Sequence, residues 1–231
     1  MRHDDIKTSA WQQWLEHPEK AGVHRALFQI HLWVGMLAGM YIFVMSLSGS
    51  AIVFRNELEV NRQSRLFKLI EWLVGLHENL LFGTAGRAVN GIGAICLTLL
   101  CLTGAIIWWP GIVHWRRSLA VNWKASFARV SWDIHNAFGF WCFLFLLFWG
   151  VSGAYFAFPQ PFNALSNFID PGDRFADEAL FWLTNLHIGR FNGSTEALWT
   201  VFGLVPAALS FTGAFMCCHR IFVRKGAPLQ R

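Results

Sequence analysis

Four long apolar runs constrain this chain more than any other feature of its sequence. Each is about 20 residues long or longer, the length that a helix needs to cross a hydrocarbon layer roughly 30 Å thick. The runs are Ala26 to Phe54, Ala88 to Trp109, Phe138 to Phe158 and Leu198 to Cys218. Composition agrees, because 55% of the residues are hydrophobic and only 14% are charged, unlike most soluble domains. We therefore predict an all-α membrane protein with four transmembrane helices.

The polar segments around these runs predict one transmembrane domain with short flanks. Residues 1–25 are expected to form a cytoplasmic leader, residues 26–220 the four-helix domain and residues 221–231 a basic cytoplasmic tail. Apolar residues in the leader follow helical spacing, which favours a helix on the membrane surface, with disorder as the alternative. The first apolar run is too long for a signal-peptide core and lacks an evident cleavage site, so we expect it to remain as a helix.

The positions of lysine and arginine predict the orientation, since basic residues near helix ends stay on the cytoplasmic side. Twelve of the 19 lie in the leader, in the connection between the second and third runs, and in the tail. Those segments share one side only if both termini face the cytoplasm. We predict an N-in, C-in protein that crosses the bilayer several times.

The net charge of +5 reflects this topology and indicates contact with membrane lipids. No basic run is interleaved with aromatic residues, so nucleic acid is not an expected partner. The five cysteines include no CxxC pair, and we interpret them as packing residues.

An internal repeat is the most informative pattern in the chain. Near the start of the first and third apolar runs, His31 and His135 lie 104 positions apart. The same offset relates Gly35 to Gly139 and Gly49 to Gly153. It indicates that the first and third helices are equivalent.

The second and fourth helices correspond as well. His77 and His187 lie 110 positions apart, and the Thr-Gly-Ala segments that begin at Thr103 and Thr212 lie 109 apart. The repeated unit is therefore a helix hairpin, and two copies joined in the same sense predict a pseudo-twofold axis along the membrane normal.

Topology then sorts the four repeated histidines into two pairs at two depths. His31 and His135 fall near the cytoplasmic face, whereas His77 and His187 fall near the opposite face. Intramembrane histidines are costly unless they face a partner, and imidazole is an axial ligand of haem iron. We predict a bundle that holds two b-type haems, the first through His31 and His135 and the second through His77 and His187. A single histidine could instead be a packing residue or part of a proton relay.

Four glycines are expected to give these haems clearance. Gly35 and Gly139 come four residues after their histidines and lie on the same helix face. Gly49 and Gly153 come eighteen residues after theirs, five helical turns away and near the opposite surface. Gly35-x-x-x-Gly39 is also a helix-packing motif, so close helix approach is the competing interpretation. The same periodicity fails between His77 and Gly104, where a straight helix is not expected.

At this point the motifs resemble those of a known family. HLWVG and SGSAIVFRNEL mark the first helix, LH and TGAIIWWPG the second, DIHNAFG and SGAYFAF the third, and LHIG and TGAFMCCHR the fourth. In order and spacing they resemble the PepSY-associated transmembrane (PepSY_TM) family. That resemblance implies a di-haem reductase of the bacterial inner membrane. Several members of the family are tied to the reduction of iron in siderophores. The resemblance also places His31, His77, His135 and His187 on the family's histidine positions.

One departure changes the expected activity. The outer connections, Arg55 to Trp72 and Pro159 to Leu186, are too short to form the large periplasmic PepSY domain. We therefore expect transmembrane electron transfer from a cytoplasmic flavin or a quinol to a periplasmic acceptor, with a protein redox partner or a larger complex. The alternatives are an accessory subunit of a respiratory complex and, less favoured, a small proton-coupled transporter.

Overall fold

The computed structural model describes residues 22–55, 64–109, 115–172, 175–189 and 193–226, and this part of the chain is helical without any strand. The predicted surface helix of the leader lies outside these residues. The helices follow one another as α2 (Gly22–Ile52), α4 (Arg65–Asn79), α5 (Gly83–Trp108), η2 (Trp115–Leu119), α6 (Phe127–Trp141), α7 (Phe143–Ala157), α8 (Pro159–Ile169), α9 (Ala176–Ile188), α10 (Gly193–Gly203) and α11 (Val205–Gly226).

Three helical segments are long and apolar enough to cross a membrane. They are Gly22–Ile52, Gly83–Trp108 and Gly193–Ile221, the last of which combines α10 with α11. A fourth crossing is formed if α6 and α7 act as one span, although they meet at an angle of 69°. The predicted third helix was straight and began at Phe138, so the break at Cys142 is a difference from the prediction. It places His135 on α6, before the bend.

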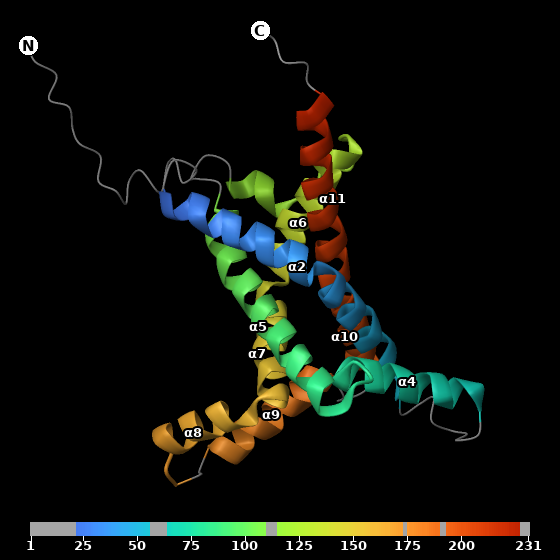
Figure 1. Cartoon of the computed structure of the whole chain (residues 1–231), viewed down its shortest axis with the longest axis vertical. Helices are drawn as coiled ribbons and strands as arrows, with labels where there is room; N and C mark the ends of the chain where they lie inside the picture. The colour runs from blue at the N-terminus through green and yellow to red at the C-terminus, as the bar shows by residue number, and fades with distance from the viewer. Residues whose placement is uncertain (1–21, 56–63, 110–114, 173–174, 190–192, 227–231) are drawn as a thin grey trace, which may run out of the picture.

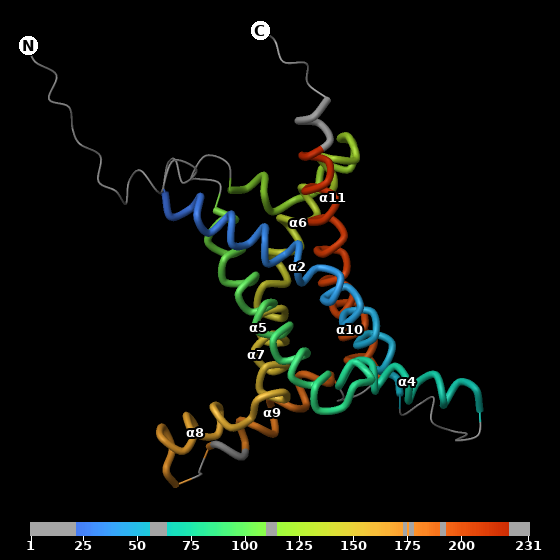
Figure 2. Tube along the Cα trace, in the orientation of Figure 1, coloured from blue at the N-terminus to red at the C-terminus, as the bar shows by residue number. Residues whose placement is uncertain are grey.

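These helices form a bundle in which α5 lies along α7, α2 contacts α5 and α11, and α11 contacts α6. Figure 1 shows α5 and α7 descending together, while α2 crosses near α5 and then turns down beside α10, and the tube in Figure 2 follows the same path. Glycines allow the close contacts. A Cβ atom on Gly150 would lie 2.5 Å from Thr98 Oγ1, so α7 reaches α5 only without a side chain there.

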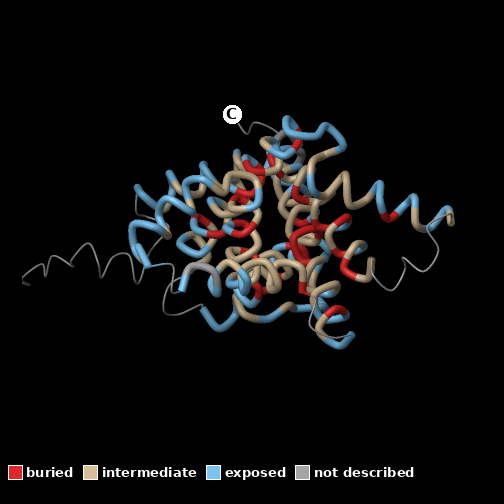
Figure 3. The backbone as a smooth tube through the Cα atoms, turned by 90° about the horizontal axis from the view of Figure 1, so that it is seen from below, coloured by how far each residue is buried: buried red, intermediate tan, exposed pale blue. Residues whose placement is uncertain are grey.

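The bundle buries several hydroxyl groups and exposes large apolar side chains. Buried hydroxyl side chains include Ser48, Thr103, Ser152 and Thr212, while Leu37 and Phe168 are 83% and 84% exposed. The buried segments run through the middle of the molecule in Figure 3. Large apolar side chains that face outward are stable in lipid but not in water. The chain is therefore a membrane protein, with its polar groups turned toward each other.

Three shorter helices extend sideways from one end of the bundle. Figure 1 shows α4 leaving in one direction and α8 with α9 in the other. The exposed side chains on α4 and α8 include Leu66, Leu69, Leu165 and Ile169, as on helices that lie at a membrane surface. The described parts of the two outer connections, which were predicted as loops, are thus largely helical, and His77 and His187 lie on α4 and α9.

A sharp turn separates α4 from α5. Leu80 and Leu81 adopt the left-handed conformation, with φ of 52° and 64°, and Gly83 follows with φ of 59°. A Cβ atom on Gly86 would overlap the Asn79 carbonyl, so the chain folds back tightly here. This confirms that no straight helix joins His77 to Gly104.

Candidate functional site

The structure brings His31 of α2 and His135 of α6 together. Their ring centroids are 6.3 Å apart and the ring planes meet at 89°. This is the geometry of an edge-to-face contact between two rings. One metal ion bound between them, with metal–nitrogen bonds of about 2 Å, would separate the two centroids by roughly 6 Å. The observed spacing therefore fits two axial ligands of one iron.

Each of these imidazoles is held through Nδ1 by a threonine of the neighbouring helix. His31 Nδ1 lies 3.0 Å from Thr103 Oγ1, and His135 Nδ1 lies 3.1 Å from Thr212 Oγ1 and 3.1 Å from the Leu209 carbonyl. A carbonyl can only accept, and the Thr103 hydroxyl already donates to the Leu99 carbonyl at 2.7 Å. Nδ1 is therefore the donor in both rings, which leaves a lone pair on Nε2 for a metal.

His77 and His187 form a second pair with the same arrangement. His77 Nδ1 lies 3.1 Å from Ser48 Oγ, and His187 Nδ1 lies 2.6 Å from Ser152 Oγ. Both hydroxyls donate to a carbonyl of their own helix, Ser48 to Val44 at 2.9 Å and Ser152 to Phe148 at 2.7 Å. The serine oxygens therefore accept from Nδ1–H, and Nε2 is again the free nitrogen.

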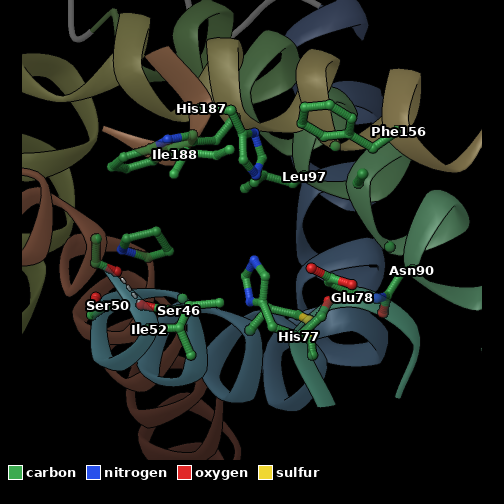
Figure 4. A pocket seen from close by; sticks show the side chains of 18 of the residues that line it. Ser46, Ser50, Ile52, His77, Glu78, Asn90, Leu97, Phe156, His187 and Ile188 are labelled. Carbon is green, nitrogen blue, oxygen red and sulfur yellow. Dashed lines mark hydrogen bonds between the residues drawn. The ribbon is translucent and has the colours of Figure 1, made fainter. Parts of the chain in front are cut away.

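A cavity of about 430 Å³ lies between this second pair. Figure 4 shows His77 and His187 pointing toward one another across it, from opposite walls. Apolar side chains make up most of the lining, among them Ile42, Leu97 and Phe156. A largely apolar cavity with two converging nitrogen ligands is typical of a site for a flat, apolar cofactor.

Burial keeps both of these imidazoles neutral. It lowers the pKa of His77, and burial together with the nearby His77 lowers the pKa of His187 to about 3. Neutral imidazole is the form that binds metal. The second pair is thus in its ligand state at neutral pH without any proton having to leave.

A hydroxyl residue followed by glycine recurs at all four histidines, as Ser48-Gly49, Thr103-Gly104, Ser152-Gly153 and Thr212-Gly213. Cβ atoms on Gly49, Gly104 and Gly213 would lie 2.8, 3.1 and 3.2 Å from Cε1 of His77, His31 and His135. At Gly153 the near atom is Ala94 Cβ, at 3.1 Å. The glycine thus admits the imidazole edge at three of the four positions. Sequence reasoning missed this role, although the repeated dipeptide was the available signal.

The glycines expected to clear the haems have varied surroundings. Gly49 lies against the His77 ring, while Gly35 has Leu100 Cδ2 as its near neighbour, 3.7 Å from an added Cβ, and Gly139 faces open space among the described residues. Haem clearance at Gly35, Gly49, Gly139 and Gly153 stays a prediction.

The two other described histidines, His24 and His219, and the cysteines take no part in these pairs. His24 Nε2 lies 3.4 Å from the Ile107 carbonyl, and the His219 ring lies 5.8 Å from that of Phe215. His3, His17 and His114 lie outside the described residues. All five cysteines are free thiols, and the part of the chain that the structure describes contains no group of three or more metal-binding side chains.

Comparison with known proteins gives a family match and one relative. Residues 60–172 match the family model of the PepSY-associated TM region. An uncharacterized protein of Pseudomonas aeruginosa is 30% identical over 88 residues, which cover 37% of this chain and 21% of the relative. The chain thus spans about a fifth of that relative's length. No solved structure matches the chain. The match confirms, over residues 60–172, the resemblance to this family that the sequence motifs suggested.

Proposed function

We propose that this protein carries electrons across a membrane by means of two b-type haems. His31 and His135 would ligate one iron and His77 and His187 the other. The observation that carries the proposal is the fourfold contact between an imidazole Nδ1 and a hydroxyl of a neighbouring helix. It fixes every ring in the tautomer that offers Nε2 to a metal.

The number of ligands favours haem over a bare metal ion. Each site offers two imidazoles, and the described residues add no third ligand to either. Protein sites for zinc use three or four side chains, whereas haem iron needs only axial ligands because the macrocycle supplies the rest. The two imidazoles of each pair would hold one haem, which would supply single-electron transfer and leave no position for a substrate on iron.

The two pairs lie near opposite ends of the bundle. His31 and Ser48 are both on α2 and are separated by 17 residues, which is about 25 Å along a straight helix. Ser48 holds His77 through its hydroxyl, so the single helix α2 runs from one site to the other. Together the sites would reach across most of a hydrocarbon layer roughly 30 Å thick.

The residues around the irons have distinct tasks in this proposal. The four hydroxyls orient the imidazoles and raise their basicity through the hydrogen bond to Nδ1. A cytoplasmic flavin or a quinol would donate at the end of His31 and His135, and a periplasmic acceptor, with a partner protein, would receive at the end of His77 and His187. This direction assumes an N-in orientation in a bacterial inner membrane, which the distribution of basic residues favours.

Electron transport in vesicles tests the proposal directly. The purified protein is placed in lipid vesicles that contain ascorbate, with ferricyanide outside and an ionophore to balance charge. We expect ferricyanide to be reduced faster than by empty vesicles, and His187→Ala to abolish the difference. His219→Ala, at an exposed ring outside both pairs, is the control. A wild-type rate equal to that of empty vesicles would contradict the proposal.

A further inference from the structure

The rim of the cavity between His77 and His187 carries charge that the axial ligands do not explain. Arg55, Glu78 and Arg87 line the cavity together with its apolar walls. Arg87 belongs to α5, Glu78 follows His77 on α4, and Arg55 comes shortly after the end of α2. Helices α4 and α5 and the segment that follows α2 thus bring two guanidinium groups and one carboxylate to a single opening.

These charges are not balanced within the described residues. Arg55 and Glu78 approach to 3.8 Å, with side chains 29% and 52% exposed, which is long for a charge-assisted hydrogen bond of about 2.8 Å. Arg87 forms no ion pair with any residue that the structure describes. Two guanidinium groups and one carboxylate give the rim a net positive charge, which favours an anion.

The cavity therefore favours a ligand with one apolar end and one anionic end. Its inner part is apolar and presents two neutral imidazoles, and its mouth presents two guanidinium groups. Guanidinium binds carboxylate in a planar, two-bonded arrangement, and more strongly where water is partly excluded. Haem b has this division, with an apolar ring and two propionate carboxylates on one edge.

We propose that Arg55 and Arg87 bind the propionates of the haem held by His77 and His187, so that the carboxylate edge faces the outer mouth of the cavity. This inference rests on the proposed function. It also gives Glu78 a role, because this carboxylate competes with a propionate for Arg55. A carboxylate of an external electron acceptor would have the same chemistry, so the test must separate the two sources.

The experiment compares two cofactors that differ only in their carboxylates. Apoprotein of His135→Ala, in which the other pair is broken, is loaded with iron protoporphyrin IX or with its dimethyl ester. Arg87→Gln and Arg55→Gln are introduced into this background, and Arg65→Gln, an exposed arginine of α4 outside the cavity, serves as the matched control. Cofactor loss to excess apomyoglobin is followed by absorbance. The full chain is measured in parallel in case His135→Ala does not fold.

We expect Arg87→Gln to speed the loss of iron protoporphyrin IX roughly three- to tenfold, because a partly exposed ion pair contributes only a small free energy of binding. The dimethyl ester should leave the wild-type and the Arg87→Gln protein at the same rate, and Arg65→Gln should change neither rate. If the arginines instead bind a carboxylate of an external acceptor, Arg87→Gln would change the loss rate of neither cofactor, and this result overturns the inference. Equal acceleration for both cofactors also overturns it, because the arginines would then be structural.

Failure of the underlying function gives a different result. If the wild-type chain binds neither cofactor with the absorption spectrum of a bis-imidazole haem, the proposed function fails and the inference with it. If the wild-type chain binds both and the arginine variants have no effect, only the inference fails.

Discussion

At the scale of single residues, the four hydroxyl–imidazole contacts are what orients the histidine rings. A serine or threonine gives its proton to its own helix and accepts one from a histidine on the next element, as Ser152 does between Phe148 and His187. Such back-bonded hydroxyls are common in membrane helices. Here the second bond fixes which nitrogen of the ring is free.

Ser48→Ala tests this hydroxyl–imidazole contact at His77. Loss of the hydroxyl should leave the ligand in place but free its ring to rotate, lowering haem affinity at that site by about 10- to 100-fold. Ser50→Ala is the matched control, since Ser50 is buried on the same helix, lines the same cavity and has no hydrogen-bond partner among the described residues. Haem titration of both apoproteins measures the difference, and equal affinities would contradict the role of Ser48.

Gly49→Ala tests the space beside the same imidazole. The added methyl would lie 2.8 Å from His77 Cε1, so the ring must move and haem binding at this pair should weaken. Gly39→Ala on the same helix meets nothing within 4 Å among the described residues and should improve helix stability by up to about 1 kcal/mol. Haem content per chain distinguishes the two. Similar content in both variants would show that the space at Gly49 is not needed.

The lowered pKa values of His77 and His187 predict that the haem-free protein is sensitive to acid. Both rings stay neutral in the folded chain below the ordinary pKa of 6.5, whereas in the unfolded chain they take up protons there. Stability should therefore fall as the pH drops from 6.5 toward the folded value of about 3 at His187.

Thermal unfolding of the apoprotein in detergent checks the direction of this pH dependence. The midpoint temperature is compared at pH 7.5 and pH 5. His187→Gln should reduce the difference between the two pH values, while His219→Gln, at an exposed ring, should not. A midpoint that rises on acidification would contradict the burial of these imidazoles as neutral groups.

At the scale of elements, the sequence predicted the apolar helices better than the connections between them. Hydropathy identifies a span because about 20 apolar residues have few other uses. It cannot predict the bend at Cys142, which depends on how α6 and α7 pack against α5 and α11. The lateral helices α4 and α9 were also missed, because segments with charged residues and only moderate hydropathy resemble loops.

Leu80→Gly tests the turn that carries the chain from α4 into α5. Leu80 ends α4 with φ of 52° and its N–H bonds to the Gly75 and Leu76 carbonyls, a helix end that glycine adopts without steric cost. The change should stabilise the folded chain by about 0.5–1 kcal/mol. Leu102→Gly, in the middle of α5 and exposed to lipid, should destabilise it by a similar amount. Thermal midpoints in detergent measure both, and a lower midpoint for Leu80→Gly would contradict this account of the turn.

At the scale of the whole molecule, the internal repeat predicted which histidines would meet. The offset of 104 residues put His31 with His135, and the structure places their rings 6.3 Å apart. The repeat also marked Thr103 and Thr212, but only packing shows that these hydroxyls hold the rings. The arginines at the cavity rim were not predicted, because nothing in the sequence around Arg87 indicates which way its helix faces.

Both histidine pairs are complete within one chain, which predicts how the isolated protein behaves. An accessory subunit of a larger respiratory complex would hold haems that are only structural, or none, whereas each pair here would supply both imidazoles to one haem. We expect the chain to keep its haems when it is purified alone in detergent. Haem that is retained only in the presence of another protein would favour the accessory role.

The number of haems per chain tests the central claim most directly. A dithionite-reduced minus oxidised spectrum, combined with a pyridine haemochrome assay on purified protein, gives both the haem type and the count. The account predicts two b-type haems per chain, one in His135→Ala and one in His187→Ala. A wild-type chain that holds no haem, or a single haem unaffected by either substitution, would contradict it.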